Sequence, residues 1–414
     1  MIRENNPEII QRLFVKKVLK LWCYRMNNYN NNITIKDQRK IGLDIIRAIA
    51  ILSVVVSHSS EFLGRIVNAP YISKAAGIFT SFAQPLGVLG VELFFVLSGF
   101  LIGNILINIF LNTGFTFTDV RNFWIRRWMR TLPLYWLILT VDIYKILKFH
   151  GIVSYKFLYY FFLQNLWYPH PQFFFGEAWS LSVEEWFYIT LPLVMLISGI
   201  VFHPANKRIF LLRVFISYAL IFIVVRFINA FHPINGPDQD TGIRKVVIFR
   251  LDSVMYGVLF AYLNIFSAPL LARIKKLLLL VSVVGFIGLY YLIKNPATVI
   301  SSTNEGVRFM SDVFLYLLIP LLLSFCLPFA NGIKKINNKY ISKAIVHISK
   351  ISYSMYLTHY SLIFISFFFY LKVTAAPFVI ALYLGYWPIV ILLSSILYKY
   401  YEHPIMKLRE RLSK

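Results

Sequence analysis

The sequence predicts an all-α protein: a polytopic integral membrane bundle of about ten transmembrane helices, with both ends of the chain in the cytoplasm. Composition is the first reason, since 58% of the 414 residues are hydrophobic and 14% are charged, against about 25% charged in an ordinary soluble domain. The second reason is that ten apolar stretches are long enough to cross a hydrocarbon core about 30 Å thick. The same apolar content excludes a disordered chain, and two cysteines are too few for a disulfide framework.

Lys and Arg test the number of spans, because cytoplasmic loops of membrane proteins carry the excess of both. With the N-terminus inside, the cytoplasmic segments hold 28 of the 42 basic residues and the outer loops hold 8. The net charge of +24 is therefore mostly topology and does not indicate a nucleic-acid partner. Segment 60–85 is expected to be an outer loop and 108–130 a cytoplasmic loop. The spans are placed at 41–59, 86–107, 131–149, 180–202, 209–229, 247–265, 277–293, 309–330, 351–371 and 377–398.

The segment before the first span, 1–40, is expected to be a cytoplasmic amphipathic arm and linker. Residues 8–26 place Phe14 and Trp22 near one face with lysines largely elsewhere, which suits a helix lying on anionic headgroups. The Asn-rich stretch 27–32 is then a polar linker. A signal peptide is not expected, because an unbroken apolar core and a small-residue cleavage site are both missing.

One apolar segment is too short to cross the membrane. Residues 157–167 (FLYYFFLQNLW) precede Pro169 and Pro171. If this segment did cross, every later loop would change side and the charge bias after it would reverse. We therefore expect an interfacial or re-entrant helix here.

The first span carries three ionisable residues. Such residues cost at least about 2.5 kcal/mol each inside a membrane and are usually paired or functional. Arg47 and His58 are eleven residues apart, which is about three helical turns and roughly 16 Å along one helix face. Asp44 is placed to pair with Arg47. The plain alternative is an arginine that reaches the headgroups and a histidine satisfied by a neighbouring helix.

Three arginines follow the second span in NFWIRRWMRTLP: Arg126, Arg127 and Arg130. Guanidinium groups bind phosphate in a bidentate way, so the cluster could form a cytoplasmic anion site. Arg126 and Arg130 are one turn apart and can converge on one ligand. The alternative is an anchor that only obeys the charge bias of cytoplasmic loops.

Later spans carry further charges. Glu184 and Glu185 are adjacent and project about 100° apart, so they cannot serve one site in the same way. Arg250 and Asp252 are expected to pair with other helices and not with each other. A purely structural ion-pair network remains the alternative for these four residues.

Two further residues lie within apolar spans. His359 is in the middle of the ninth span, where a packed, hydrogen-bonded histidine is the plain alternative to a functional one. Gly99 in FFVLSGFLIG is expected to permit close helix packing. The sequence has no metal-ligand constellation, phosphate-binding glycine loop or nucleophilic serine elbow at useful spacing.

Six motifs occur in the order typical of one family. The chain resembles the acyltransferase 3 family, membrane enzymes that acylate sugars of bacterial surface polysaccharides and other small acceptors. The resemblance covers 41–405 and leaves 406–414 as a basic cytoplasmic tail. Trp186 departs from the family's common Gln and could alter the acceptor pocket. The motifs are Leu43-Asp44 with Arg47 and His58; Gly90 to Phe95 with Ser98 to Leu101; Arg126-Arg127, Arg130 and Pro133; Trp179 to Leu181 with Glu184; Arg250 to Asp252; and Ser352-Tyr353 with Tyr356 and His359.

The resemblance implies an O-acyltransferase of the bacterial inner membrane that moves an acyl group, most often acetyl, from cytoplasmic acyl-CoA to a glycan hydroxyl. It implies a donor site at Arg47, Arg126, Arg127 and Arg130. His58 would be the general base. Glu184 would orient or charge-stabilise that base, and Arg250 with Asp252 would complete the catalytic group. Acceptor-binding residues would be Glu185, Trp179, Tyr356 and His359.

Acyl-CoA would be a co-substrate, and neither a permanently bound cofactor nor a metal is expected. The expected partners are the lipid bilayer, acyl-CoA and a glycan acceptor, without nucleic acid. A transporter or flippase is the rival class, in which the same buried charges form a substrate path. The sequence shows no inverted repeat of interrupted helices, which disfavours transport. A sensor or scaffold would leave His58 and Glu184 unexplained.

Overall fold

The computed structural model describes residues 40–412, with gaps at 67–68, 114, 150–155, 172–173, 232, 236–239, 295–305, 307–308, 310 and 372. The chain divides into two units, Met1–Lys40 and Ile41–Lys414. The predicted N-terminal arm lies outside the described residues apart from Lys40, as do the last two residues of the predicted basic tail.

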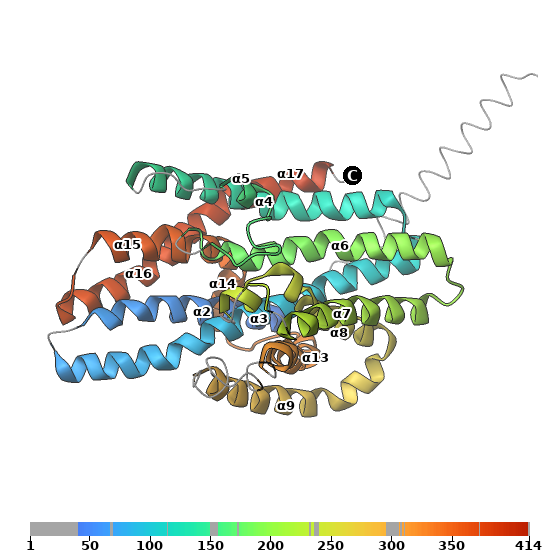
Figure 1. Ribbon diagram of the computed structural model, residues 1–414, viewed down its shortest axis with the longest axis horizontal. Helices are drawn as coiled ribbons and strands as arrows, with labels where there is room; N and C mark the ends of the chain where they lie inside the picture. The colour runs from blue at the N-terminus through green and yellow to red at the C-terminus, as the bar shows by residue number, and fades with distance from the viewer. Residues whose placement is uncertain are drawn as a thin grey trace, which may run out of the picture. The chain divides into compact units, whose positions relative to one another are not determined.

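The second unit is helical throughout its described part, where no β-strand occurs (Figure 1). Its first half contains α2 (Ile41–Ser60), η1 (Glu61–Arg65), α3 (Pro70–Thr113), α4 (Phe117–Phe149), α5 (Lys156–Tyr160), α6 (Ala178–Phe202) and α7 (Lys207–Phe231). Its second half contains η2 (Asp240–Arg244), η3 (Val247–Phe249), α8 (Leu251–Phe266), α9 (Ala268–Lys294), η4 (Ser311–Leu315), α12 (Tyr316–Ser324), α13 (Leu327–Asn331), α14 (Lys339–Thr358), η5 (His359–Phe364), α15 (Ile365–Tyr370), α16 (Ala376–Leu397), η6 (Tyr398–Glu402) and α17 (His403–Leu412).

Seven of the described helical segments are long and apolar enough to cross a membrane. The other three predicted spans correspond to α4, α8 and the α14–α15 segment. Charged residues are spread along α4, α8 has only 16 residues, and α14 is lysine-rich and ends where η5 begins. The seven segments are Ile41–Arg65, Pro70–Asn112, Ala178–Phe202, Lys207–Phe231, Ala268–Lys294, Ser311–Asn331 and Ala376–Arg409.

The predicted outer loop 60–85 is wrong, because this stretch is mostly helical. After the 3-10 turn η1, α3 begins at Pro70 and continues for 44 residues. Proline is favoured in the first turn of a helix, where its missing N–H has no helical partner to lose. Scattered polar residues such as Ser73 and Lys74 lower the hydropathy of the first turns and hid this helix from the search for apolar spans.

Segment 108–130, predicted as a cytoplasmic loop, is also mostly helical, because α3 continues to Thr113 and α4 begins at Phe117 and contains the whole arginine cluster. A capping box fixes this start. The Thr116 backbone N–H donates to Asp119 Oδ2 at 2.8 Å, and the Asp119 backbone N–H donates to Thr116 Oγ1 at 3.4 Å. The arginines therefore lie on a rigid helix.

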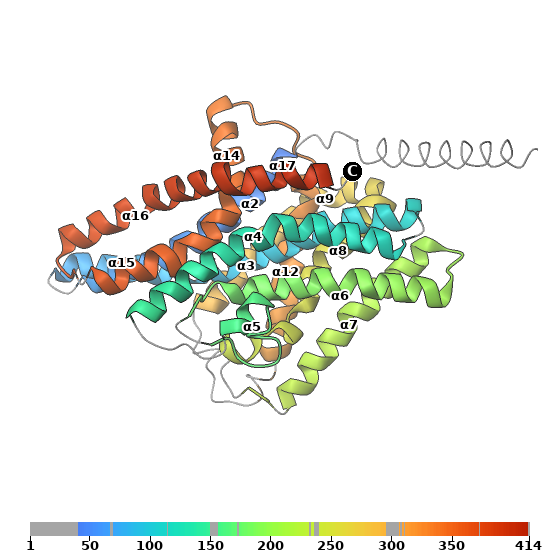
Figure 2. The same ribbon diagram turned by 90° about the horizontal axis from the view of Figure 1, so that it is seen from above.

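The apolar segment 157–167 does not form a spanning helix, as predicted. Its helix α5 has five residues and is followed by turns (Figure 2). Asn165 ties the segment to the chain before α8, because its carbonyl accepts from Val247 N at 2.9 Å and its amide donates to Lys245 O at 2.7 Å.

Two glycines bring α3 and α8 into backbone contact. A Cβ built on Gly99 would lie 1.9 Å from the carbonyl oxygen of Val254, and one built on Gly257 would lie 2.0 Å from that of Val96. Neither position has room for a methyl group. The predicted packing role of Gly99 is therefore confirmed.

We expect Gly257→Ala to destabilise the protein by about 1 to 3 kcal/mol, because the added methyl meets rigid backbone and must push the helices apart. The unfolding midpoint in detergent would measure this loss. Gly385→Ala is the matched control, since nothing lies within 4 Å of a Cβ at that position of α16. Equal midpoints for the two variants would contradict the assigned role of Gly257.

Candidate active site

Helices α2 and α14 lie side by side and run in the same direction. Arg47 Nη1 donates to Ser349 Oγ at 3.1 Å, and eleven residues further along α2, His58 Nδ1 lies 2.9 Å from His359 Nε2. Arg47 also pairs with Asp44 at 3.4 Å, as the sequence predicted. The face that Arg47 and His58 share is therefore the face that α2 turns toward α14.

The contacts of His359 fix the protonation of both rings. His359 Nδ1 lies 3.0 Å from Met355 O and 2.8 Å from Tyr356 O. Carbonyl oxygens only accept, so Nδ1 carries the proton and Nε2 of the neutral ring is an acceptor. His58 Nδ1 must then donate to it. The Nε2 of His58 is left with its lone pair, which is the arrangement that a general base needs.

The two histidines differ in exposure. His359 is fully buried, whereas His58 is only half-buried. The Tyr360 ring packs on His58 with centroids 4.5 Å apart, and the Tyr356 ring lies 5.7 Å from that of His359. His58 is therefore the more exposed ring of the pair, and its Nε2 has no hydrogen-bond partner among the described residues.

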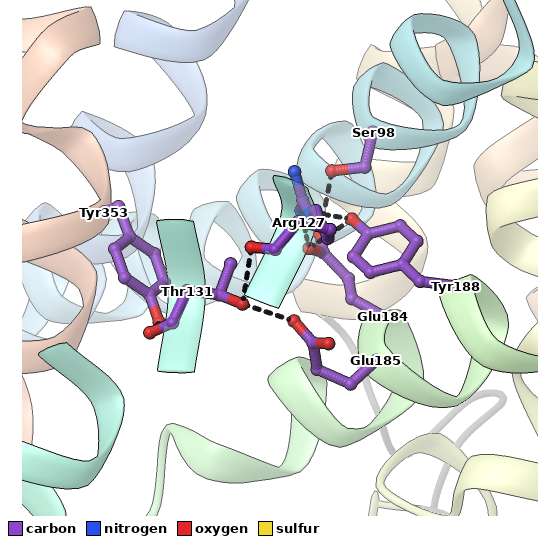
Figure 3. Close-up of polar contacts among 7 residues, drawn as sticks. All are labelled: Ser98, Arg127, Thr131, Glu184, Glu185, Tyr188 and Tyr353. Carbon is purple, nitrogen blue, oxygen red and sulfur yellow. Dashed lines mark hydrogen bonds and ion pairs between the residues drawn. The ribbon is translucent and has the colours of Figure 1, made fainter. Parts of the chain in front are cut away.

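Glu184 does not contact His58, contrary to the expectation that it would orient this ring. It accepts hydrogen bonds from Ser98 Oγ at 2.9 Å and Tyr188 Oη at 2.7 Å, and it pairs with Arg127 at 3.3 Å (Figure 3). The side chain that orients His58 is His359. Sequence spacing could not distinguish them, because both lie on helices whose rotation is set by packing.

Glu185 serves a different contact from Glu184, as their angular separation predicted. Its carboxylate accepts from Thr131 Oγ1 at 2.9 Å (Figure 3). Thr131 in turn is linked to α14, since its carbonyl accepts from Tyr353 Oη at 2.7 Å. Glu185 therefore joins α6 to α4, the helix that carries the arginines. Glu185 and His359 were both predicted to bind the acceptor, but His359 contacts His58 instead of this group.

The predicted arginine cluster is split by the structure. Arg127 points into the bundle, where its guanidinium lies 4.1 Å from the centre of the Tyr188 ring and pairs with Glu184. Arg130 is exposed and Arg126 is half-buried one turn away on the same helix. The predicted one-turn spacing of Arg126 and Arg130 is therefore kept, whereas Arg127 faces away from the predicted anion site.

Two buried ion pairs lie on α3, α7 and α8. Arg250 pairs with Glu92, and Arg226 binds Asp252 through two hydrogen bonds of 2.9 and 2.8 Å. Both guanidinium groups are 0% exposed. Arg250 and Asp252 thus have partners on other helices, as expected. Sequence reasoning did not identify Arg226 as a buried ion-pair residue, although an arginine within the apolar run IFIVVRFINAF indicates one.

Arg250 also retains hydrogen-bonding capacity. Its Nε and Nη1 have no hydrogen-bond partner among the described residues, although the side chain is completely buried. Its guanidinium lies over the Tyr316 ring at 4.5 Å. Buried donors without partners are costly, and they are suited to stabilise developing negative charge.

A cation near the histidine pair, Arg244, was also missed by sequence reasoning. Arg244 lies over the Trp179 ring at 4.8 Å and forms an ion pair with Asp240. The charges of Arg244 and Lys245 act on the His58 ring. Burial alone would raise the pKa of the Asp240 carboxyl, but these two cations hold it well below its usual range. In the sequence analysis, Arg244 and Lys245 contributed only to the number of basic residues in the outer loops.

The predicted acceptor-binding residues Trp179 and Tyr356 are linked through one serine. Tyr356 Oη lies 2.5 Å from Ser180 Oγ, next to Trp179 in α6. The Trp179 ring packs edge-on against Phe95 at 6.0 Å. Tyr356 therefore connects α14 with α6 beside the histidine pair, and Trp179 connects α6 with α3.

A family model for an acyltransferase domain matches residues 40–399, nearly the whole helical unit. The chain belongs to the acyltransferase 3 family. The acyltransferase 3 match includes every ionisable residue described above.

Relatives in Staphylococcus aureus are also similar to this acyltransferase 3 chain. The O-acetyltransferase OatA of strain NCTC 8325 / PS 47 is 27% identical over 387 residues, which cover 88% of this chain and 57% of OatA. SACOL0978 of strain COL, provisionally named an O-acetyltransferase, is 25% identical over 405 residues, covering 92% and 60%. The chain thus spans less than two thirds of the length of these relatives. No solved structure matches it significantly.

One carboxyl close to the histidine pair has a raised pKa. Glu177, the residue before α6, accepts hydrogen bonds from the hydroxyl and the backbone N–H of Ser361, two residues after His359. Burial, with a smaller contribution from Asp142, raises the pKa of Glu177 from 4.5 to about 8. At neutral pH this carboxyl therefore keeps its proton.

This pKa predicts how stability depends on pH. Between about pH 4.5 and 8 the folded protein holds a proton on Glu177 that the unfolded chain releases, so the folded state loses stability as pH rises through this window. Glu177→Gln cannot ionise, and its unfolding midpoint in detergent should fall less between pH 5 and 8 than that of the wild type. Parallel curves for the two proteins would contradict the raised pKa.

Proposed function

We propose that this protein is an integral membrane O-acyltransferase that moves an acyl group, most simply acetyl, from cytoplasmic acyl-CoA to a hydroxyl of a sugar in a cell-surface polysaccharide or lipid-linked glycan. The observation that carries this proposal is the histidine pair, in which His359 leaves His58 Nε2 free as a base. Family membership and the names of the S. aureus relatives support the same reaction class.

We place the protein in the bacterial inner membrane with ten crossings, both termini in the cytoplasm, and 41–405 as the catalytic domain. Helix directions support this topology. Glu92 pairs with Arg250, Gly99 meets Val254, and Gly103 meets Val258, so the two helices α3 and α8 run parallel. Parallel helices need an odd number of crossings between them, which α4, α6 and α7 supply if 157–167 does not cross. The parallel pair α2 and α14 satisfies the same condition.

Site-specific labelling tests this topology. Thr374→Cys, in the predicted last outer loop, should react with a membrane-impermeant maleimide in intact spheroplasts. Lys334→Cys, between α13 and α14, should react only after the membrane is opened. Both positions are exposed, so access is limited only by the membrane. Labelling of both residues from the outside would overturn the proposed orientation.

Acyl-CoA would enter from the cytoplasm, with its phosphates on Arg126 and Arg130 and with Arg47 contributing at the end of α2. Guanidinium groups suit these phosphates, since they bind them in a bidentate way. Arg127 would act on the donor indirectly, because Glu184 already neutralises it. The separation of about 16 Å between Arg47 and His58 suits an extended pantetheine arm.

At the far end of the arm, His58 Nε2 would take the proton of the acceptor hydroxyl as its oxygen attacks the thioester carbonyl. The carbon–sulfur bond then breaks, and the same proton passes from His58 to the leaving thiolate. Base and proton are thereby restored in one cycle. Arg250, whose buried Nε and Nη1 have no hydrogen-bond partner among the described residues, is the proposed donor to the tetrahedral oxyanion. Asp252 would act through Arg226, which it neutralises.

Purified protein in liposomes with labelled acetyl-CoA and a glycan acceptor tests the reaction. We expect His58→Ala to abolish transfer, and His359→Ala to lower it on the order of 10²-fold to 10⁴-fold, because the base loses its orienting partner. Both variants should remain folded and monodisperse in detergent. Full transfer by a folded His58→Ala variant would refute the role of His58. Wild-type protein that consumes no donor but exchanges substrate across the vesicle wall would be a transporter.

A further inference from the structure

The segment that presents His359 is not an ordinary α-helix. Helix α14 ends at Thr358, and η5 continues as a π-helix from His359 to Phe364. At its end, the backbone N–H of Ile365 bonds to the carbonyl of Tyr360, five residues earlier. Wide turns of this kind are rare and occur frequently at functional sites. Here the turn begins at the histidine that orients His58.

Three side chains from three other parts of the bundle bond to the main chain of this turn. Tyr386 of α16 donates from Oη to His359 O at 3.0 Å. Lys145 of α4 donates from Nζ to Ser361 O at 2.8 Å. Glu177, before α6, accepts from Ser361 N at 3.4 Å and from the Ser361 hydroxyl. We call Tyr386, Lys145 and Glu177 the η5 anchor.

The anchor is buried at Tyr386 and Glu177, half-buried at Lys145, and electrically balanced. Tyr386 and Glu177 are 0% and 3% exposed. Lys145 pairs with Asp142 at 3.1 Å, so one ammonium faces one carboxylate while Glu177 keeps its proton at neutral pH. Buried hydrogen bonds without net charge are costly to break, because each freed group would stay unsatisfied in an apolar surrounding. The anchor therefore holds the turn in one geometry.

We propose that the η5 anchor residues are positioning residues for catalysis, which hold the π-helical turn so that His359 Nε2 meets His58 Nδ1. The proposal rests on the proposed acyl transfer. His58 lies on a regular helix, α2, so the 2.9 Å contact between the rings depends on the shape of η5. If the turn relaxed, His359 would rotate, and the tautomer and direction of the base would no longer be fixed.

Kinetics of anchor variants test the proposal. Glu177→Ala and Tyr386→Phe should each lower kcat on the order of 10-fold to 100-fold, because small displacements of catalytic groups are costly. The KM for acyl-CoA should not change, since the donor arginines lie elsewhere. Glu177→Gln should restore the rate, because the amide can accept from Ser361 N and donate to its hydroxyl.

A double-mutant cycle separates positioning from general stability. If Glu177 acts through His359, then Glu177→Ala should cause no further loss in a His359→Ala background. Glu402→Ala is the matched control. This buried carboxyl also accepts from a serine hydroxyl of the same helix, Ser354, but on its regular α-helical part. Its removal should lower stability without the fall in kcat. Losses that multiply in the cycle, or wild-type rates in both anchor variants, would overturn the proposal.

Carbethoxylation of His58, followed by mass spectrometry, tests the anchor independently of turnover. The reagent diethylpyrocarbonate reacts with an unprotonated imidazole nitrogen such as Nε2 of His58. Glu177→Ala should therefore change the labelling rate of His58, whereas Glu177→Gln and Glu402→Ala should not. An unchanged rate in Glu177→Ala would overturn the anchor proposal. Wild-type protein without acyl transfer but with this labelling pattern would refute the proposed function alone.

Discussion

Inside an apolar bundle a charged side chain needs a partner, and this requirement governs how the helices of the protein fit together. The apolar interior does not solvate an unpaired charge, and three of the guanidinium groups are paired with a carboxylate from another helix. Arg250 joins α8 to α3, Arg226 joins α7 to α8, and Arg127 joins α4 to α6. These pairs connect the helices in two groups, α3 with α8 and α7, and α4 with α6, and the hydrogen bond from Ser98 of α3 to Glu184 of α6 joins the two groups. The helices are thereby locked in rotation as well as in distance, and the polar groups of the candidate site acquire fixed directions.

The fold class and most helix positions could be predicted from the sequence because apolar length is a local property. The spans at 41–59, 180–202 and 209–229 agree with α2, α6 and α7 to within a few residues. Apolar length does not detect helical segments that contain many polar residues. The first turns of α3 and the half of α4 that carries the arginines are two such segments. The Thr116–Asp119 capping box was the local signal that would have placed the start of α4.

The site was predictable in part for the same reason. Spacing along one helix put Arg47 and His58 on a common face, and the structure places that face against α14. Spacing could not choose between partners on other helices. The assignment of Glu184 to His58 came from the family resemblance, whereas in the structure Glu184 pairs with Arg127. The actual partner is a neutral imidazole. Among the described residues, no carboxylate forms a hydrogen bond or ion pair with His58, so in the proposed reaction an imidazolium at His58 would readily return its proton to the leaving group.

The glycine contact between α3 and α8 has an electrostatic consequence. Glu92 precedes Gly99 by seven residues, and Arg250 precedes Gly257 by seven residues, so the ion pair lies about two turns, roughly 10 Å, from the backbone contact on both helices. Because Gly99 and Gly257 have no side chains, the two helix axes lie close together, and this short distance also lets Arg250 reach Glu92. A methyl group added at either glycine would push the helices apart and thereby weaken the Coulomb attraction between Glu92 and Arg250, two turns away.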